Sequence, residues 1–291
     1  MLLLAGTPLW AWASPIVVTD DSGQNITLAQ PAQRIVALSP HIVETLFAAG
    51  AGNKIVGAVE YSDYPQAAKA IPRIGGYAGF DLEALAALKP DLVIGWETGN
   101  SPTAIDKIKR LGIPVYLSQS NTVAQVAAEI DTFGRLAGTE KVAKPAAQRF
   151  KVKVDQLEQK YGQRPVVSVF YQISESPLMT IGGKQIISNA LSLCGGRNIF
   201  ANLSPMAPVI TPEAVLAANP EVMMTSGMAE INPHALDIWQ KWSKLMATQR
   251  HNFFFIDADL VNRNGPRIIE GTQMLCKAIQ TARDRRPTAK P

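Results

Sequence analysis

A chain of 291 residues is long enough for two domains of ordinary size. Its composition, with 47% apolar and 18% charged residues, is that of a globular protein and argues against both intrinsic disorder and a chain made of membrane spans. The formal charge of +4 is modest, and no basic stripe with interleaved aromatic residues occurs, which argues against a nucleic-acid partner.

The first 13 residues combine an apolar run with the small-residue pattern Ala11-Trp12-Ala13. This pattern predicts the end of a secretory signal that is cleaved after Ala13. The usual basic segment before the apolar run is missing, so either upstream residues are absent or the start is misassigned. The alternative interpretation is an apolar N-terminal strand.

Residues 14–121 have the pattern of an α/β lobe. Short β-branched runs alternate with helical patterns, which is typical of a mostly parallel sheet. A hairpin is predicted around the turn Asp21-Ser22-Gly23-Gln24. The elements expected after it are a strand at 34–38, a helix at 41–49, a strand at 54–59, a helix and strand within 81–96, a helix at 102–111 and a strand at 115–117.

Residues 122–162 are expected to be helical, because apolar residues recur at helical spacing on both sides of a break near Gly138. No comparable strand pattern occurs in this segment. We interpret it as a helical element that bridges two lobes. The alternative is an ordinary helical hairpin inside one domain.

Residues 163–283 predict a second α/β lobe, and residues 284–291 form a basic tail. The expected elements are a strand at 165–171, a helix at 185–193, a helix and strand within 211–224, a helix at 233–245, a strand at 253–256, a polar loop at 257–266 and a helix at 267–283.

One helix–strand pattern occurs in both lobes. The pattern at 81–94 returns at 211–224, where Glu83 matches Glu213 and Pro90 matches Pro220. A carboxylate in the first turn of a helix could simply complement the helix dipole. That explanation does not account for the repetition of the whole pattern. Two equivalent carboxylates, one per lobe, would suit docking to a two-fold partner that carries basic residues.

Parallel α/β lobes bind ligands beyond the carboxyl ends of their strands. The residues expected there are mostly aromatic or weakly polar, which suits a large, partly flat organic ligand. Any one of the aromatic residues alone could equally be ordinary core packing. The candidate ligand-binding residues are Tyr61, Tyr77, Trp96, Tyr171, Met206, Asp259 and Arg263.

Motifs for catalysis are missing from the sequence. His41, His234 and His251 do not share the i, i+4 spacing of a helical metal site. No Gly-x-Ser-x-Gly elbow and no phosphate-binding glycine loop occur. We therefore expect no enzyme, no metal and no cofactor. An α/β hydrolase or a metalloenzyme is the alternative from a different class.

Two cysteines, Cys194 and Cys276, occur in the chain. In an exported protein they are most simply a disulfide pair, and two buried free thiols are the alternative.

The sequence resembles the helical-backbone class of periplasmic substrate-binding proteins that serve ABC importers, and within that class its cobalamin-binding members. The resemblance covers about residues 34–279. The motifs that carry it are Ala37-Leu38-Ser39-Pro40 with Glu44-Thr45-Leu46, Tyr61-Ser62-Asp63-Tyr64-Pro65, Leu88-Lys89-Pro90-Asp91-Leu92-Val93-Ile94, Cys194-Gly195-Gly196 and Pro266-Arg267-Ile268-Ile269.

The resemblance implies a fold and a function. The fold is two Rossmann-like α/β lobes with mostly parallel sheets, joined by a long rigid helix, with the ligand cleft between them. The function is to capture cobalamin in the periplasm and deliver it, as a monomer, to the membrane permease of an importer with a cytoplasmic ATPase.

The resemblance also implies roles for single residues. It implies that Glu83 and Glu213 pair with arginines of the permease and that Cys194 and Cys276 form a disulfide. The residues implied to contact the corrinoid are Tyr61, Tyr77, Trp96 and Asp259.

Two features depart from the cobalamin-binding pattern. Tyr77 and Ala207 stand where that pattern has tryptophan, and the hairpin at 15–28 is more similar to siderophore- and haem-binding members. A ferric siderophore or haem is therefore the alternative ligand. Anionic siderophores need basic partners, and Arg263 is the only obvious one at the predicted strand ends.

Overall fold

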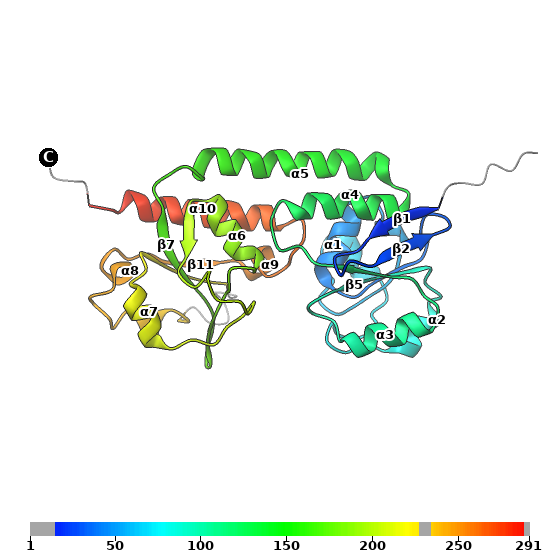
Figure 1. The fold of residues 1–291 in the computed structure, drawn as a ribbon, viewed down its shortest axis with the longest axis horizontal. Coiled ribbons are helices and arrows are strands. Elements are labelled where there is room, and N and C mark those ends of the chain that lie inside the picture. The colour runs from blue at the N-terminus through cyan, green and yellow to red at the C-terminus, as the bar shows by residue number, and fades with distance from the viewer. Residues whose placement is uncertain (1–14, 227–233, 288–291) are drawn as a thin grey trace, which may run out of the picture.

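The computed structural model describes residues 15–226 and 234–287, and it contains two α/β lobes beneath one long helix (Figure 1). The two-lobed α/β architecture predicted from the sequence is confirmed. The predicted signal segment, residues 1–13, and the end of the basic tail lie outside the described residues.

The N-terminal lobe is built on a four-stranded parallel sheet. Its elements are β3 (Ile35–Ala37), α1 (Pro40–Ala48), a 3-10 helix (Gly52–Lys54), β4 (Ile55–Ala58), a second 3-10 helix (Gln66–Ala70), α2 (Leu82–Ala87), β5 (Leu92–Trp96), α3 (Pro102–Arg110) and β6 (Val115–Ser118). The strand order is β4-β3-β5-β6. Alternate residues of β3 and β5 pack toward α1 on one face and toward α2 and α3 on the other, so the sheet is covered on both faces.

The C-terminal lobe is built on a five-stranded sheet. Its elements are β7 (Val167–Glu175), β8 (Leu178–Thr180), α6 (Ile186–Leu193), β9 (Gly196–Asn198), α7 (Pro212–Ala218), β10 (Val222–Ser226), α8 (Met246–Gln249), β11 (Phe253–Ile256), α9 (Ala258–Val261) and α10 (Ile268–Asp284). The order is β11-β10-β7-β8, with β9 beside β7, and only β8 pairs antiparallel. The short strands β8 and β9 have no counterpart in the sequence prediction.

Two helices occupy the predicted bridging segment, α4 (Gln125–Ala137) and α5 (Glu140–Tyr161). Only α5 spans both lobes: in Figure 1 it runs along the top, above α4 on one side and α10 on the other. Buried residues of α5, including Phe150, Val154 and Leu157, belong to an apolar cluster that continues from the N-terminal lobe into the C-terminal lobe. The lobes therefore share a core beneath α5.

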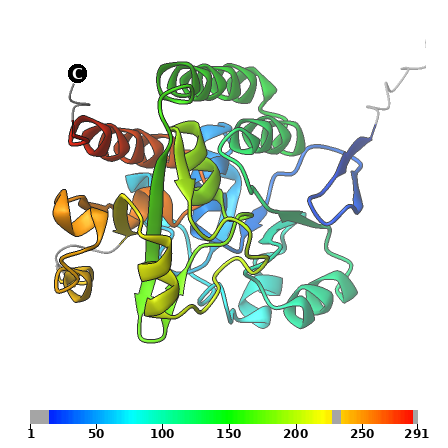
Figure 2. The same ribbon diagram turned by 60° about the vertical axis from the view of Figure 1, so that its left-hand side comes forward.

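The predicted N-terminal hairpin is confirmed as β1 (Ile16–Thr19) paired antiparallel with β2 (Asn25–Leu28). It lies at the edge of the N-terminal lobe, near α4 (Figure 2). Its turn caps the edge strand β6, because Asp20 accepts a hydrogen bond from the Leu117 amide at 3.2 Å and Asp21 accepts one from the Gln119 amide at 2.6 Å. Such a cap satisfies donors that an edge strand would otherwise expose.

The predicted helix at 233–245 is wrong. The described part of that segment, from residue 234, forms turns and a single 3-10 turn at Asp237–Trp239. Trp239 is buried, with its ring edge-on to Phe170 and its indole N–H donating to Gln172 at 2.8 Å. This tertiary packing overrides the helical spacing of the apolar residues. The predicted loop at 257–266 likewise contains the short helix α9, capped by Asp257.

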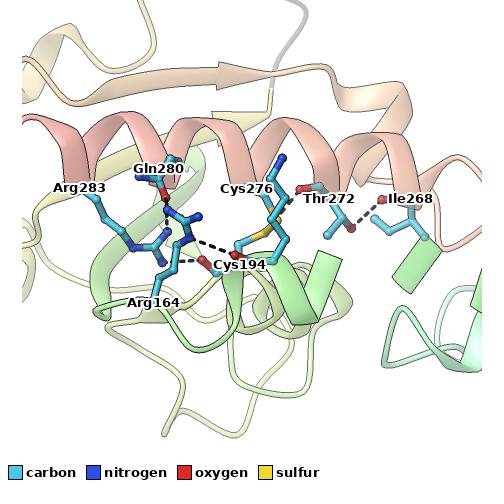
Figure 3. The surroundings of a disulfide bond; sticks show 8 residues. Arg164, Cys194, Ile268, Thr272, Cys276, Gln280 and Arg283 are labelled. Atoms are coloured by element: carbon cyan, nitrogen blue, oxygen red, sulfur yellow. Dashed lines mark hydrogen bonds between the residues drawn. A yellow bond between two sulfur atoms is a disulfide. The ribbon is translucent and has the colours of Figure 1, made fainter. Parts of the chain in front are cut away.

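The disulfide between Cys194 and Cys276 is present in the structure and joins the end of α6 to the middle of α10 (Figure 3). Both cysteines are fully buried. On the same side of α10, Arg283 donates hydrogen bonds to the carbonyls of Cys194 at 2.6 Å and Pro165 at 2.8 Å. The last helix is therefore fixed to the C-terminal lobe by a covalent bond and by side-chain contacts.

Candidate functional site

Trp96 ends β5 and is held from several sides. Its indole N–H donates to Oε1 of Gln119 at 3.0 Å, and its backbone N–H donates to Oδ1 of Asn100 at 2.6 Å. His41 packs edge-on against it, with ring centroids 5.4 Å apart. Gly99 passes directly beneath the ring, where a Cβ atom would lie 1.8 Å from the indole. A ring fixed in this way is a preorganised contact surface, which loses little entropy when a ligand stacks on it.

Two predicted tyrosines lie at the same edge of the sheet. Tyr77 stands beside Trp96, with ring centroids 6.0 Å apart, and its carbonyl accepts a hydrogen bond from Asn100 at 2.8 Å. Tyr61 follows β4 with a backbone φ of +62°, and the residue is 72% exposed. A left-handed conformation is unusual for an aromatic residue, and such positions concentrate at functional sites.

Asp259 and Arg263 form the polar side of the candidate site on the C-terminal lobe. The guanidinium of Arg263 contacts Asp259 at 3.0 Å, and it reaches the other lobe at Asp63, also at 3.0 Å. Burial lowers the pKa of Arg263, but the hydrogen bond to Asp63 and the charges of Asp259 and Glu44 together raise this pKa above its usual value. Arg263 therefore stays charged while it joins the two lobes through Asp259 and Asp63.

The structure does not connect two other predicted residues with this group. Tyr171 is 0% exposed, and burial raises the pKa of its hydroxyl. It packs in the core and presents no surface to a ligand. Met206 is partly exposed in the loop before α7, where its carbonyl accepts a hydrogen bond from Gly182 at 3.0 Å.

His41 and Gln119 contact Trp96, and the sequence did not single them out as ligand-binding candidates. His41 is almost completely buried, and its Nδ1 lies 2.7 Å from Oγ of Ser39. Burial and the charge of Arg263 lower its pKa to about 3, so the imidazole that supports Trp96 is neutral. Both residues follow strands, β3 and β6, and the strand-end rule could therefore have found them.

A cavity of about 420 Å³ lies on the α5 side of the contact between the lobes. It is lined by both lobes and α5, including Phe47, Tyr64, Ile130, Phe150 and Arg267. Trp96, Tyr77 and Asp259 do not line it. The candidate ligand-binding residues at the strand ends are thus not part of this cavity.

Glu83 and Glu213 lie in the first turns of α2 and α7, and both side chains are exposed. The helix N-termini are already capped, by Asp81 in α2 and by Thr211 in α7. Both helices lie on the side of the molecule opposite α5 (Figure 1). Neither glutamate forms an ion pair with a residue that the structure describes.

Two further properties concern metals and membranes. Within residues 15–226 and 234–287, no group of three or more His, Cys, Asp or Glu side chains is placed to hold a metal ion. In the same part of the chain, no helix is both long enough and apolar enough to cross a membrane.

Comparison with known proteins shows the family. The periplasmic binding protein family matches residues 35–260. The vitamin B12-binding protein of Vibrio campbellii is 34% identical over 276 residues, which cover 94% of this chain and 98% of that protein. The crystal structure of the periplasmic vitamin B12 binding protein of Vibrio cholerae superposes with a TM-score of 0.80 at 35% identity, covering 87% of this chain and 98% of that one.

A periplasmic haem-binding protein solved in complex with two haems shares the fold, with a TM-score of 0.76 at 24% identity over 87% of this chain and 99% of that one. The chain belongs to the periplasmic binding protein family.

Proposed function

We propose that the protein is a periplasmic substrate-binding protein that captures cobalamin between its lobes and delivers it to the permease of an ABC importer. Relatives that are 34–35% identical over most of their length are named vitamin B12-binding proteins, which supports both the ligand and the compartment. These relatives are binding proteins, which supports transport without a catalytic step.

The observations that carry the ligand proposal are the fixed aromatic pair of Trp96 and Tyr77 on the N-terminal lobe and the charged pair of Asp259 and Arg263 on the C-terminal lobe. Corrinoids are large, rigid macrocycles with an apolar ring and peripheral amides. An aromatic wall can stack against the ring, and a carboxylate and a guanidinium can bond with amide N–H and C=O groups. The exposed ring of Tyr61 would extend the aromatic wall.

Titration with cyanocobalamin, followed by visible absorption, tests this proposal. We expect saturable binding by the wild-type protein. Removing the preorganised ring in Trp96→Ala should weaken binding by about 1–3 kcal/mol, or roughly 5- to 150-fold. Trp242→Ala is the matched control, because Trp242 is a partly exposed tryptophan outside the site, and it should leave the affinity unchanged.

Haemin and a ferric hydroxamate should be titrated in the same way. Tight binding of either, with no binding of cyanocobalamin at high micromolar concentration, would overturn the ligand assignment. Equal affinity of Trp96→Ala and the wild type would place Trp96 outside the ligand-binding surface.

We also propose that Glu83 and Glu213 dock the protein to the permease. The two carboxylates are exposed, occur once per lobe on one side of the molecule, and are not needed as helix caps. Exposed carboxylates of this kind can form charge-assisted hydrogen bonds with arginines of a two-fold partner.

The double variant Glu83→Ala/Glu213→Ala should reduce cobalamin transport at least tenfold in a reconstituted importer, with cyanocobalamin affinity unchanged. Loss of these charged contacts should weaken the complex with the permease and leave the candidate ligand-binding surface unchanged. The control is Asp155→Ala/Glu158→Ala, which removes two exposed carboxylates from α5 on the opposite side. Normal transport by the first variant, or an equal loss in the control, would refute the docking role.

A further inference from the structure

One short segment of the C-terminal lobe makes most of its polar contacts with the N-terminal lobe. Residues 263–267, here called the interlobe loop, connect α9 to α10. Arg263 contacts Asp63, and Asn264 donates a hydrogen bond to the carbonyl of Ser120 at 3.1 Å. Gly265 packs so closely on the start of α1 that a Cβ atom would lie 3.2 Å from His41. The loop therefore touches three separate parts of the other lobe.

Glu44 is the centre of this contact. Its carboxylate, on α1, accepts two hydrogen bonds from Arg267, at 2.9 and 2.8 Å, and a third from Arg263 at 3.2 Å. Its side chain is 1% exposed, and those of the two arginines are 13% and 14% exposed. The guanidinium of Arg267 also lies 4.2 Å from the ring centroid of Tyr64. One buried acid thus binds two arginines from the opposite lobe.

A buried ion pair adds little net stability, because the cost of removing the charges from water offsets much of their attraction. Such a pair instead fixes the relative position of the two groups that form it. The planar guanidinium of Arg267 and the carboxylate of Glu44 form a bidentate pair, which tolerates little rotation or sliding of one partner against the other. A change in the angle between the lobes would break this pair and leave a buried charge without its partner, which is strongly unfavourable.

The same contact fixes a residue of the candidate ligand-binding surface. Nη1 of Arg263 is shared by Glu44 and Asp63, and Nη2 contacts Asp259. The position of the Arg263 guanidinium between Asp259 and Asp63 therefore depends in part on Glu44.

We propose that Glu44 is a positioning residue that fixes the two lobes at one relative orientation and holds Arg263 at the cleft, so that the ligand enters a preformed site. The statement about the ligand rests on the proposed function, whereas the statement about lobe orientation does not. The single helix α5 and the shared core beneath it act in the same direction.

Interlobe distances in the ligand-free protein test this proposal. The native cysteines are joined to each other, so Lys107→Cys on α3 and Lys244→Cys in the C-terminal lobe, both at exposed positions, can carry spin labels. Double electron–electron resonance should give a narrow distance distribution for the otherwise wild-type protein. Glu44→Gln should broaden or shift it. Glu270→Gln, which removes the same charge from an exposed position on α10, should leave it unchanged.

Arg267→Lys provides a second, milder variant, because lysine keeps the charge but cannot form the bidentate pair. It should also broaden the distribution, and it carries the test by itself if Glu44→Gln does not fold. In a cyanocobalamin titration, Glu44→Gln should bind at least tenfold more weakly and Glu270→Gln should bind normally.

The possible results distinguish the proposed role of Glu44 in lobe orientation from its proposed effect on ligand binding. A narrow, unshifted distribution in every folded Glu44 or Arg267 variant would overturn the positioning role. If the distribution broadens but the wild type does not bind cyanocobalamin, the proposed function fails and the role in lobe orientation stands. Broadening with unchanged ligand affinity would overturn the inferred link to the cleft.

Discussion

Replacing Glu129 by glutamine is expected to make the protein more stable than the wild type at pH 9, by up to about 5 kcal/mol. Below pH 5, the free energies of unfolding of the two proteins should depend on pH in nearly the same way. Glu129 lies on α4 and is almost completely buried near the end of β6, where Oγ of Ser118 and Oγ of Ser120 donate to its carboxyl group. Burial raises its pKa to about 8, the charge of Asp21 adds to this effect, and the hydrogen bond from Ser120 opposes it.

The sign of the pH dependence follows from that raised pKa. Above an ordinary pKa of 4.5 the unfolded chain has released the proton, whereas the folded protein keeps it up to about pH 8. Between these values the unfolded state binds fewer protons, so the free energy of unfolding falls by about 1.4 kcal/mol per pH unit as the pH rises. Glutamine does not titrate, so this slope should disappear in Glu129→Gln.

Urea unfolding followed by circular dichroism at pH 5, 7 and 9 measures this effect. Asp131→Asn is the matched control, because Asp131 lies two residues further along α4 and is not fully buried. The control should keep the wild-type slope. Parallel pH profiles for Glu129→Gln and the wild type would show that Glu129 is not a buried neutral acid.

Glu129 also contacts the segment that positions Trp96 in the candidate site. Ser118 and Ser120 flank Gln119, whose side chain accepts the hydrogen bonds of Trp96 and Thr98. The turn of the β1–β2 hairpin holds the same segment from the other side, through Asp20 and Asp21. The segment that positions Trp96 is therefore stabilised from α4 and from the hairpin, and neither contributes a side chain that was selected as a ligand contact.

Much of the fold could be predicted because its signals lie close together in the sequence. The alternation of strands and helices, the turn at Asp21–Gln24 and the repeat that contains Glu83 and Glu213 each depend on neighbouring residues. The helix predicted at 233–245 failed for the opposite reason. Its spacing is helical, but the contacts of Trp239 with Phe170 and Gln172, far away in the sequence, determine the local conformation.

The residues of the candidate site were likewise predicted where the signal is local and missed where it depends on distant contacts. The strand-end rule selected Trp96, Tyr77 and Arg263, which the structure places in fixed pairs. It did not select Glu44, because Glu44 lies within a helix and meets Arg263 and Arg267 only after folding, across more than 200 residues. One signal was available: Glu44 is the only acidic residue in α1, whose other residues are mostly apolar. A lone carboxylate on a buried helix needs a cationic partner.

Removing the disulfide should lower the free energy of unfolding by an amount similar in size to the gain expected for Glu129→Gln at pH 9. In the chain-entropy model, a cross-link between positions 82 residues apart contributes about 4 kcal/mol, because it restricts the unfolded chain. We therefore expect Cys194→Ala/Cys276→Ala to lower the free energy of unfolding by about 3–5 kcal/mol in urea titrations. The folded variant should retain its lobes, since Arg283 still ties α10 to the Cys194 and Pro165 carbonyls.

Reduction supplies the control for this effect. A reductant should bring the wild-type unfolding curve toward that of the double variant and leave the variant's own curve unchanged. The contact between the lobes should persist in the folded variant, because Glu44 and Arg267 are unchanged and Arg283 still ties α10 to the C-terminal lobe. The variant should therefore unfold at lower urea concentration but bind cyanocobalamin with wild-type affinity while folded. Two free thiols in the denatured, non-reduced wild-type protein would contradict the cross-link itself.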